Sequence, residues 1–123
     1  MAYIIIADDD ELVTDIAREA LQEAGHTVGV VANGADAWQA ILQKRPDLVI
    51  LDCNMPEAGG ILVLRQMRNR IDLASMPVLM LTGRRSDADV ELAMREGATA
   101  YMKKPFDPDE LVFRIENIVG PAH

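Results

Sequence analysis

The sequence is poor in cysteine, histidine and aromatic residues, and it has no long apolar run. Its one cysteine, Cys53, cannot form an internal disulfide, which suits a reducing compartment. Its two histidines, at positions 26 and 123, stand in a turn and at the tail, away from any ligand cluster. No segment approaches the length of a membrane span, and no basic leader precedes the first apolar run. We therefore expect a cytoplasmic protein.

Basic residues are also few. The sequence has 12 Lys and Arg against 20 Asp and Glu, which gives a formal net charge of −8. This balance argues against a nucleic-acid partner and against an anionic membrane surface, because both are bound through clustered basic side chains. With 123 residues, half of them hydrophobic, the chain can bury a core without a metal or disulfide staple. We expect residues 1–123 to form one domain.

Two hydrophobic periods alternate along the chain. Short apolar runs, two of them continuous blocks typical of strands covered on both faces, occur at 3–7, 27–31, 48–51, 78–81 and 98–102. Between them, apolar residues recur every three or four positions, as on one face of a helix. Five strands alternating with five helices predict right-handed crossovers and a parallel sheet between helix layers.

The helical stripes also predict which side chains are buried. In the third helix the recurring apolar residues are Leu62, Leu64, Met67 and Ile71. In the first helix, Leu12 lies outside the stripe and is expected to be exposed. The same helix is preceded by Asp10, which we interpret as its N-cap.

Each strand except the second is followed by a polar or ionisable residue. Asp8 and Asp9 follow the first strand, Asp52 the third, Thr82 the fourth and Lys104 the fifth. In doubly wound sheets, ligands bind outside the carboxyl ends of the strands. These side chains are therefore expected to converge at one edge of the sheet.

Converging carboxylates suggest a bound cation. Two carboxylates about 4 Å apart repel by roughly 4 kcal/mol at an effective dielectric constant near 20. Anionic oxygen ligands favour a hard divalent ion, and Mg²⁺ fits best because it commonly uses one or two carboxylates with a phosphate. With Mg²⁺ bound, Asp52 could attack a phosphoryl group, and Thr82 and Lys104 could face its oxygens.

Four motifs carry a family resemblance: "ADDDE" after the first strand, "LDCNMP" after the third, "LTG" after the fourth and "KKPF" after the fifth. Together they resemble the receiver domain of two-component response regulators, from position 2 to about position 119. The resemblance implies a flavodoxin-like, doubly wound α/β fold with strand order 2-1-3-4-5. It also implies a signalling module that catalyses only its own phosphorylation and dephosphorylation.

Carried over residue by residue, the resemblance makes Asp52 the phosphoacceptor. It assigns Mg²⁺ binding to Asp8, Asp9, Asp52 and the backbone carbonyl of Asn54. Thr82 and Lys104 would contact the phosphoryl group, and Tyr101 would change rotamer on activation. The Lys104–Pro105 peptide bond would be cis.

The resemblance also implies partners. A sensor histidine kinase or a histidine phosphotransfer protein would donate the phosphoryl group, and we place its docking site near Leu12 and Ile16. A downstream effector would read the face formed by the fourth helix, fifth strand and fifth helix. That face includes Val90, Met94, Tyr101, Lys103 and Phe113.

The sequence departs from the common family pattern after "MP". Many receivers have Asp-Gly after this element, whereas this chain reads "EAGG" at 57–60. The missing Asp removes an N-cap from the third helix, which costs about 1 kcal/mol. Strand alternation directs Cys53 away from the Asp52 side chain, so we interpret it as a small buried residue.

Three alternatives remain open at this point. The chain could be a receiver excised from a longer regulator or a hybrid histidine kinase. It could be an aspartate-nucleophile phosphatase, but such enzymes need a second Asp where this chain has Asn54. It could be a flavodoxin, but "ADDDE" would repel a flavin phosphate.

Overall fold

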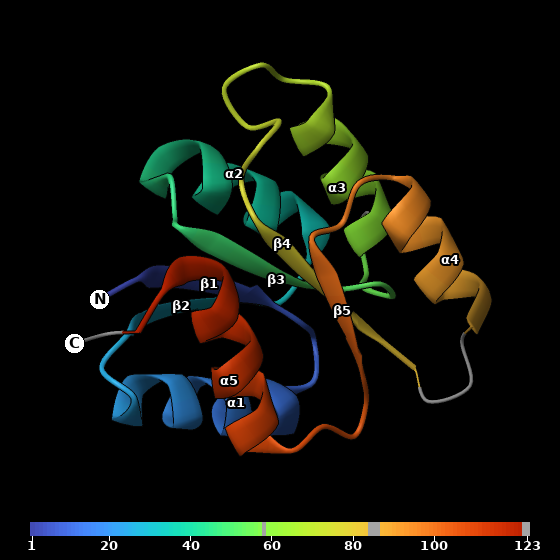
Figure 1. The fold of residues 1–123 in the computed structure, drawn as a ribbon. Helices are drawn as coiled ribbons and strands as arrows, with labels where there is room; N and C mark the ends of the chain where they lie inside the picture. Colours follow the sequence, from blue (N-terminus) through green and yellow to red (C-terminus); the bar gives the residue numbers. More distant parts are fainter. Residues whose placement is uncertain (58, 84–86, 122–123) are drawn as a thin grey trace.

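The computed structural model describes residues 1–57, 59–83 and 87–121. Within them, strands and helices alternate: β1 (Tyr3–Ala7), α1 (Glu11–Glu23), β2 (Thr27–Val31), α2 (Gly34–Lys44), β3 (Leu48–Asp52), α3 (Gly60–Arg68), β4 (Val78–Thr82), α4 (Asp87–Arg95), β5 (Ala100–Lys103) and α5 (Pro108–Val119). The strands form one parallel sheet in the order β2-β1-β3-β4-β5 (Figure 1). The fold is the flavodoxin-like one that the sequence motifs imply.

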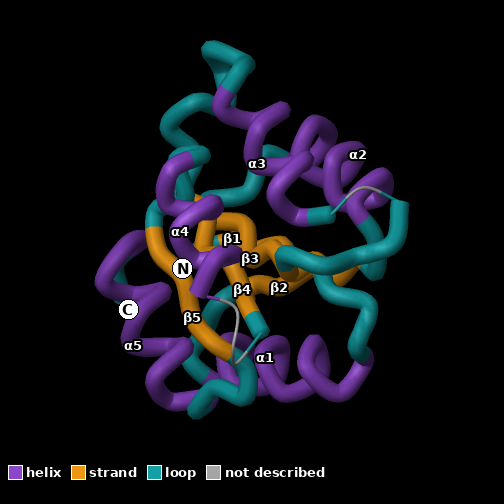
Figure 2. The backbone as a smooth tube through the Cα atoms, turned by 90° about the vertical axis from the view of Figure 1, so that its right-hand side faces the viewer, coloured by secondary structure: helices purple, strands orange, loops and turns teal. Residues whose placement is uncertain are grey.

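Two helix layers cover the sheet. Helices α1 and α5 pack on one face, and α2, α3 and α4 pack on the other (Figure 2). Every residue of the central strands β3 and β4 is buried. Their continuous apolar blocks follow from this arrangement, because both faces of a central strand lie inside the protein.

Alternation along β3 separates the two hydrophobic clusters. Leu48 and Ile50 pack toward α1 and α5, whereas Val49 and Leu51 pack toward α2, α3 and α4. Cys53 belongs to the same cluster as Val49 and Leu51, so it points away from the preceding Asp52 side chain. The prediction of a small buried cysteine is confirmed. Burial raises the pKa of its thiol from 9.0 to about 12, which makes it a poor nucleophile at neutral pH.

Local signals set the helix ends. The Asp10 carboxylate accepts a hydrogen bond from the Leu12 backbone N–H at 3.0 Å, so Asp10 is the predicted N-cap of α1. Gly25, with a φ of 99°, follows the end of α1 in a conformation that suits glycine. Helix α3 starts after Gly59, which makes no side-chain cap, as its sequence predicts. Leu12 is 68% exposed, as expected.

The predicted buried face of α3 is partly wrong. Leu64 and Met67 are buried, but the third buried apolar side chain is Val63, and Leu62 is half-exposed. Ile71 lies beyond the end of α3 and is 99% exposed. Four consecutive apolar residues, 61–64, left the face of this helix ambiguous in the sequence.

The predicted strand bounds need small corrections. Strands β3 and β4 each run one residue further than predicted, through Asp52 and Thr82. Strand β5 begins two residues later than predicted, at Ala100. None of the helices in the described part of the chain is both long and apolar enough to cross a membrane.

Candidate functional site

The carboxyl ends of β1 and β3 bring three aspartates together. Ala7 pairs with Leu51 in the parallel ladder, so Asp8 and Asp52 follow at neighbouring positions. Asp8, Asp9 and Asp52 each offer an oxygen, and these oxygens lie within 4.8 Å of one another. Asp8 and Asp52 are buried, whereas Asp9 is exposed. The convergence expected from the sequence is therefore present.

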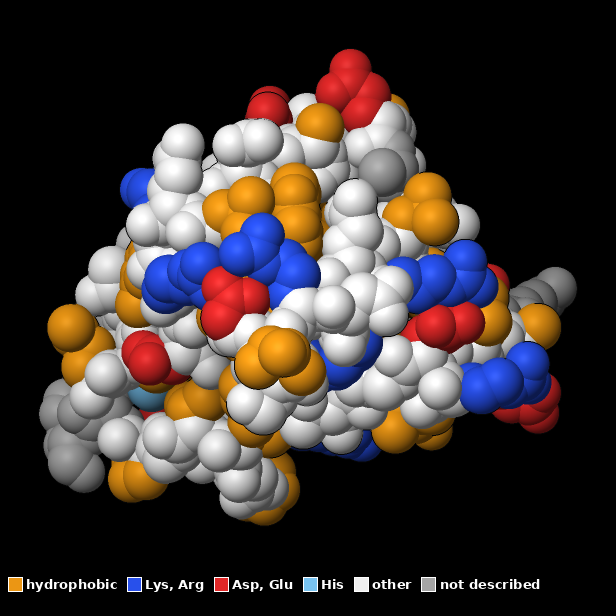
Figure 3. Space-filling view, turned by 90° about the horizontal axis from the view of Figure 1, so that it is seen from above, with side chains coloured by type: hydrophobic (Ala, Val, Ile, Leu, Met, Phe, Trp, Pro, Cys, Tyr) orange, Lys and Arg blue, Asp and Glu red, His pale blue; other side chains and the backbone are white. Residues whose placement is uncertain are grey.

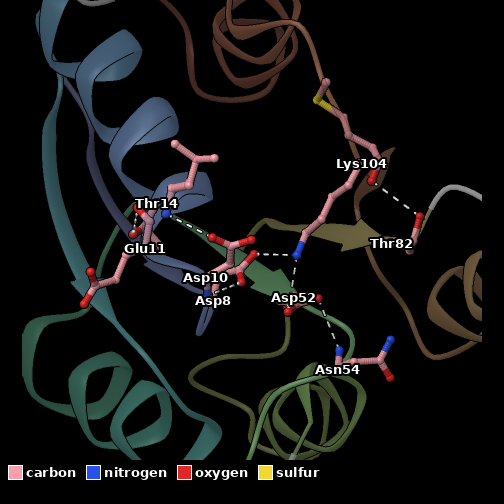
Figure 4. A network of polar contacts seen from close by, with 10 residues as sticks. Asp8, Asp10, Glu11, Thr14, Asp52, Asn54, Thr82 and Lys104 are labelled. Atoms are coloured by element: carbon pink, nitrogen blue, oxygen red, sulfur yellow. Dashed lines mark hydrogen bonds and ion pairs between the residues drawn. The ribbon is translucent and has the colours of Figure 1, made fainter.

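The two oxygens of Asp8 have different surroundings (Figure 4). Oδ1 accepts a hydrogen bond from the Asp10 backbone N–H at 3.0 Å. Oδ2 is buried, and its partner among the described residues is the Lys104 ammonium. The Lys104 ammonium lies 2.7 Å from it as an ion pair. A carboxylate oxygen carries more than one lone pair, so a cation could bind Oδ2 beside the ammonium group.

Lys104 reaches into the site from the segment after β5. Its Nζ lies 3.4 Å from Oδ2 of Asp52 as well as 2.7 Å from Asp8. Its backbone N–H donates to the Thr82 carbonyl at 2.8 Å, which extends the β4–β5 ladder by one residue. The Lys104–Pro105 bond is cis, as the resemblance implies.

Burial and mutual repulsion change the acidity of the site. Burial first, and then the Asp8 charge, raise the pKa of Asp52 from 3.8 to about 6, against the opposing effects of Asn54 and Lys104. Burial works to lower the pKa of Lys104, but contacts with Asp8 and Asp52 outweigh it and raise that pKa. A single ammonium therefore does not fully compensate the two buried carboxylates.

The site residues fit a hard divalent cation. All the available ligand atoms are oxygens, and in the described part of the chain the three carboxylates of the cluster share a single ammonium group, that of Lys104. Asn54, whose carbonyl was the expected further ligand, donates its backbone N–H to Oδ1 of Asp52 at 3.3 Å. This bond holds the turn that follows β3 against the Asp52 side chain.

The two switch candidates lie on β4 and β5. The Thr82 side chain is fully buried, and its hydroxyl donates a long hydrogen bond of 3.4 Å to the Met102 carbonyl. Tyr101 is half-buried and packs against the hydrophobic cluster under α2, α3 and α4. Its carbonyl accepts a hydrogen bond from Arg114 of α5 at 2.9 Å. Neither side chain has a hydrogen bond to Asp52 in the described structure.

A close backbone contact at Asp52 was missed in the sequence. The start of α3 lies so near the end of β3 that a Cβ on Gly60 would be 2.2 Å from the Asp52 carbonyl oxygen. A Cβ on Gly59 would be 2.8 Å from the Cys53 carbonyl oxygen. The signal was the Gly59–Gly60 pair itself, because paired glycines permit close approach of two backbone segments.

Comparisons with known proteins agree with this geometry. Residues 4–116 match the response regulator receiver domain family. The chain is 36% identical over 119 residues to the transcriptional regulatory protein GltR of Pseudomonas aeruginosa, covering 97% of this chain and 49% of GltR. The chain thus spans about half the length of this curated relative.

Solved structures give the same result. The chemotaxis response regulator CheY4 of Vibrio cholerae superposes with a TM-score of 0.89 at 30% identity, covering 96% of this chain and 98% of CheY4. The receiver domain of the sensor histidine kinase PA1611 of Pseudomonas aeruginosa, described with a magnesium ion in its active site cleft, superposes with a TM-score of 0.88 at 25% identity. The coverage is 97% of this chain and 98% of that domain.

The family match accounts for nearly the whole described chain and for the acidic site at its strand ends. It replaces the phosphatase and flavodoxin alternatives. This chain belongs to the response regulator receiver domain family of two-component signalling systems.

Proposed function

We propose that this receiver accepts a phosphoryl group on Asp52 from a phosphohistidine donor, with Mg²⁺ bound beside it. The observation that carries the proposal is the convergence of Asp8, Asp9 and Asp52 within 4.8 Å, with Lys104 at the same point. The product would be the protein phosphorylated on Asp52, which acts as a signal, rather than a released metabolite. The chain would catalyse only its own phosphorylation and the hydrolysis that reverses it.

The transfer is a nucleophilic substitution at phosphorus. An oxygen of the Asp52 carboxylate forms the new P–O bond as the P–N bond to the donor imidazole breaks, and the imidazole keeps the electron pair. Lys104, already 3.4 Å from Asp52, would donate to a phosphoryl oxygen. Hydrolysis then returns Asp52 and inorganic phosphate.

Asp8, Asp9, Asp52 and the backbone carbonyl of Asn54 would hold the Mg²⁺. When bound, the ion offsets the mutual repulsion of the carboxylates and the charge of the phosphoryl oxygens. Support comes from the three carboxylates that converge within 4.8 Å and from the related PA1611 receiver, which is described with magnesium in its active site cleft.

The phosphoryl group would act on Thr82 and Tyr101. It adds nearly two negative charges, which would attract the Thr82 hydroxyl away from its long bond to Met102. The space left would let Tyr101 bury its ring further. This biases a two-state equilibrium and changes the face formed by α4, β5 and α5, on which Met94 and Phe113 are exposed.

The partners follow from the family. Receiver domains interact with histidine kinases or phosphotransfer proteins and with effector domains. We place the donor on α1, where Leu12 and Ile16 are exposed beside the acidic site. GltR is about twice as long as this chain, which is consistent with the alternative that this receiver is part of a longer regulator. A cytoplasmic location and a lack of direct nucleic-acid contact by residues 1–123 stay predictions.

Incubation with acetyl phosphate and MgCl₂, followed by intact-mass measurement, tests the proposal. We expect one phosphoryl adduct in the wild type, with no adduct in EDTA. Asp52→Asn should give none, whereas Asp10→Asn, which keeps a helix cap outside the cluster, should react as the wild type does. An adduct that persists in Asp52→Asn would refute the assignment of the phosphoacceptor.

A second experiment tests the donor surface. Leu12→Ala should slow transfer from a phosphorylated histidine phosphotransfer protein while leaving the acetyl phosphate rate unchanged, because the small donor does not contact α1. The matched control is Leu62→Ala, which truncates a half-exposed leucine on α3. Equal slowing with both donors would contradict docking on α1.

A further inference from the structure

A turn between α3 and β4 lies at the edge of the sheet opposite the phosphoacceptor. Asp8 and Asp52 follow their strands, whereas Arg45 and the residues 70–72 precede β3 and β4. Since all strands are parallel, these two sets lie at opposite edges of the sheet. We name the group formed by Arg45, Arg70, Ile71 and Asp72 the Ile71 knuckle.

Two arginines of the knuckle share one carboxylate. Arg70 donates two hydrogen bonds, from Nε and Nη2, to the two oxygens of Asp72, each at 3.0 Å. Nη1 of Arg45 lies 2.8 Å from Oδ2 of Asp72. These hydrogen bonds, first that from Arg70 and then that from Arg45, hold the pKa of Asp72 below its usual range. Asp72 is ionised at neutral pH and bridges the two arginines.

The knuckle is also anchored to the core. The fully buried Leu73 donates its backbone N–H to the Arg70 carbonyl at 3.1 Å, and its own carbonyl accepts from Arg68 at 3.2 Å. The Arg70 guanidinium lies over the Trp38 ring, 5.9 Å from its centroid. These contacts connect the knuckle to the buried core and to α2.

Ile71 stands at the tip of this turn and is 99% exposed. The ion pairs on either side of it leave its whole side chain in water, although Ile is among the residues most often buried. A partner that covers Ile71 would remove this apolar surface from water. An apolar residue flanked by arginines has a composition common in protein–protein interfaces.

The charge around the knuckle is opposite to that of the molecule. Arg65 pairs with Glu96 at 3.0 Å, and Arg68 bonds the Gly97 carbonyl at 2.9 Å, so a band of arginines continues from the knuckle toward the end of α4. Basic residues outnumber acidic ones in this band, whereas the whole chain has 12 basic and 20 acidic residues. The band consists of Arg45, Arg65, Arg68, Arg70, Asp72 and Glu96. Figure 3 looks onto the molecule from above and shows basic groups interspersed with single acidic side chains.

We propose that the Ile71 knuckle docks an acidic segment of a partner protein that carries an apolar side chain over Ile71. Its carboxylates would pair with Arg45, Arg70 and the neighbouring arginines. Its backbone N–H groups would donate hydrogen bonds to the carboxylates of Asp72 and Glu96. These two carboxylates would repel a nucleic-acid phosphate. Because the knuckle lies across the sheet from Asp52, the partner would bind the receiver whether or not it is phosphorylated.

Selection from a random dodecapeptide display library on the immobilised full chain tests this. We expect enrichment of peptides in which Asp or Glu flank an apolar residue, with binding measured by fluorescence polarisation. Ile71→Ser and Arg45→Glu should each weaken binding at least tenfold, and Leu62→Ser, a matched exposed apolar residue on α3, should change it less than twofold. Acetyl phosphate with MgCl₂ should leave the affinity unchanged.

Several results would overturn the proposal. Enriched peptides without an acidic bias, or an absence of enrichment, would remove the charge argument. Acidic peptides that bind Ile71→Ser as well as the wild type would place their site elsewhere. Tighter binding of a labelled DNA duplex than of the selected peptides would show that the arginine band recognises phosphate instead. Since Ile71 is fully exposed, Ile71→Ser should unfold at the wild-type temperature, which separates lost binding from lost structure.

Discussion

Nζ of Lys104 lies 2.7 Å from Oδ2 of Asp8, closer than the 3.4 Å that separates it from Asp52. The lysine thus makes its shorter contact with a proposed metal ligand rather than with the proposed phosphoacceptor. A cation held by Asp8 would share that carboxylate with an ammonium group. The two positive charges would then repel each other across a buried oxygen.

We therefore predict that Lys104→Met binds Mg²⁺ more tightly, by about tenfold, because the competing positive charge is removed. Isothermal titration calorimetry at low ionic strength would measure the affinity. The control is the neighbouring Lys103→Met, whose ammonium pairs with Asp87 at 2.6 Å, outside the carboxylate cluster. Unchanged or weaker Mg²⁺ binding by Lys104→Met would show that the lysine does not oppose the ion.

The pKa of Asp52 leads to a prediction about stability in EDTA. Because that pKa is raised from 3.8 to about 6 in the folded state, the ionised carboxylate costs stability above pH 6, and the cost vanishes below pH 4. A shift of this size corresponds to about 2 to 3 kcal/mol. Asp52→Asn should therefore be more stable than the wild type by about 2 kcal/mol at pH 7.

Urea unfolding of both proteins at several pH values would check this. The difference in free energy of unfolding should shrink as the pH falls from 7 to 4, because the wild-type carboxyl becomes neutral in the folded state. Asp9→Asn, which alters an exposed carboxylate of the same cluster, should change stability much less. A stability difference that is constant with pH would mean that Asp52 titrates normally.

Mg²⁺ should raise the melting temperature through the acidic cluster. At a concentration ten times its dissociation constant, a ligand of the folded state adds about 1.4 kcal/mol, or a few degrees for a domain of this size. Asp9→Asn should lose most of this increase. Asp10→Asn should keep it, because Asn caps a helix as well as Asp does.

Differential scanning calorimetry with MgCl₂, and with NaCl at matched ionic strength, gives this measurement. The comparison is informative because positions 9 and 10 are adjacent and both are exposed. If both variants lost the increase equally, or if NaCl reproduced it, the effect would be general screening of the net negative charge rather than a bound ion.

The sequence predicted the sheet because its signals are local. Apolar blocks specify the buried strands, and polar residues after them specify the edge where Asp8, Asp52 and Lys104 meet. The finer contacts were not predictable. Which carboxylate Lys104 approaches more closely depends on side-chain torsions, and the exposure of Ile71 depends on where α3 ends. The expected stripe through Ile71 assumed a helix that continues past Arg68, whereas the chain turns there.

The N-terminus of α3 also depends on a contact that the sequence does not reveal. The family pattern predicts a lost Asp N-cap within 57–60, and the structure places the N-cap of α3 at Gly59, so Gly59→Asp would be expected to restore about 1 kcal/mol. In the structure, a Cβ at Gly59 would lie 2.8 Å from the Cys53 carbonyl oxygen, a contact with backbone that cannot move easily. We therefore predict that Gly59→Asp lowers the free energy of unfolding, by about 1 to 2 kcal/mol.

Gly59→Ala separates the two effects in this prediction, because it adds the Cβ without a capping group. Both variants should unfold at lower urea concentration than the wild type, with Asp the milder of the two if its carboxylate caps α3. Gly60→Ala should be more damaging than either, since its Cβ would be 2.2 Å from the Asp52 carbonyl oxygen. A Gly59→Asp protein more stable than the wild type would mean that the turn before α3 can move away from Cys53, and with it the backbone that positions Asp52.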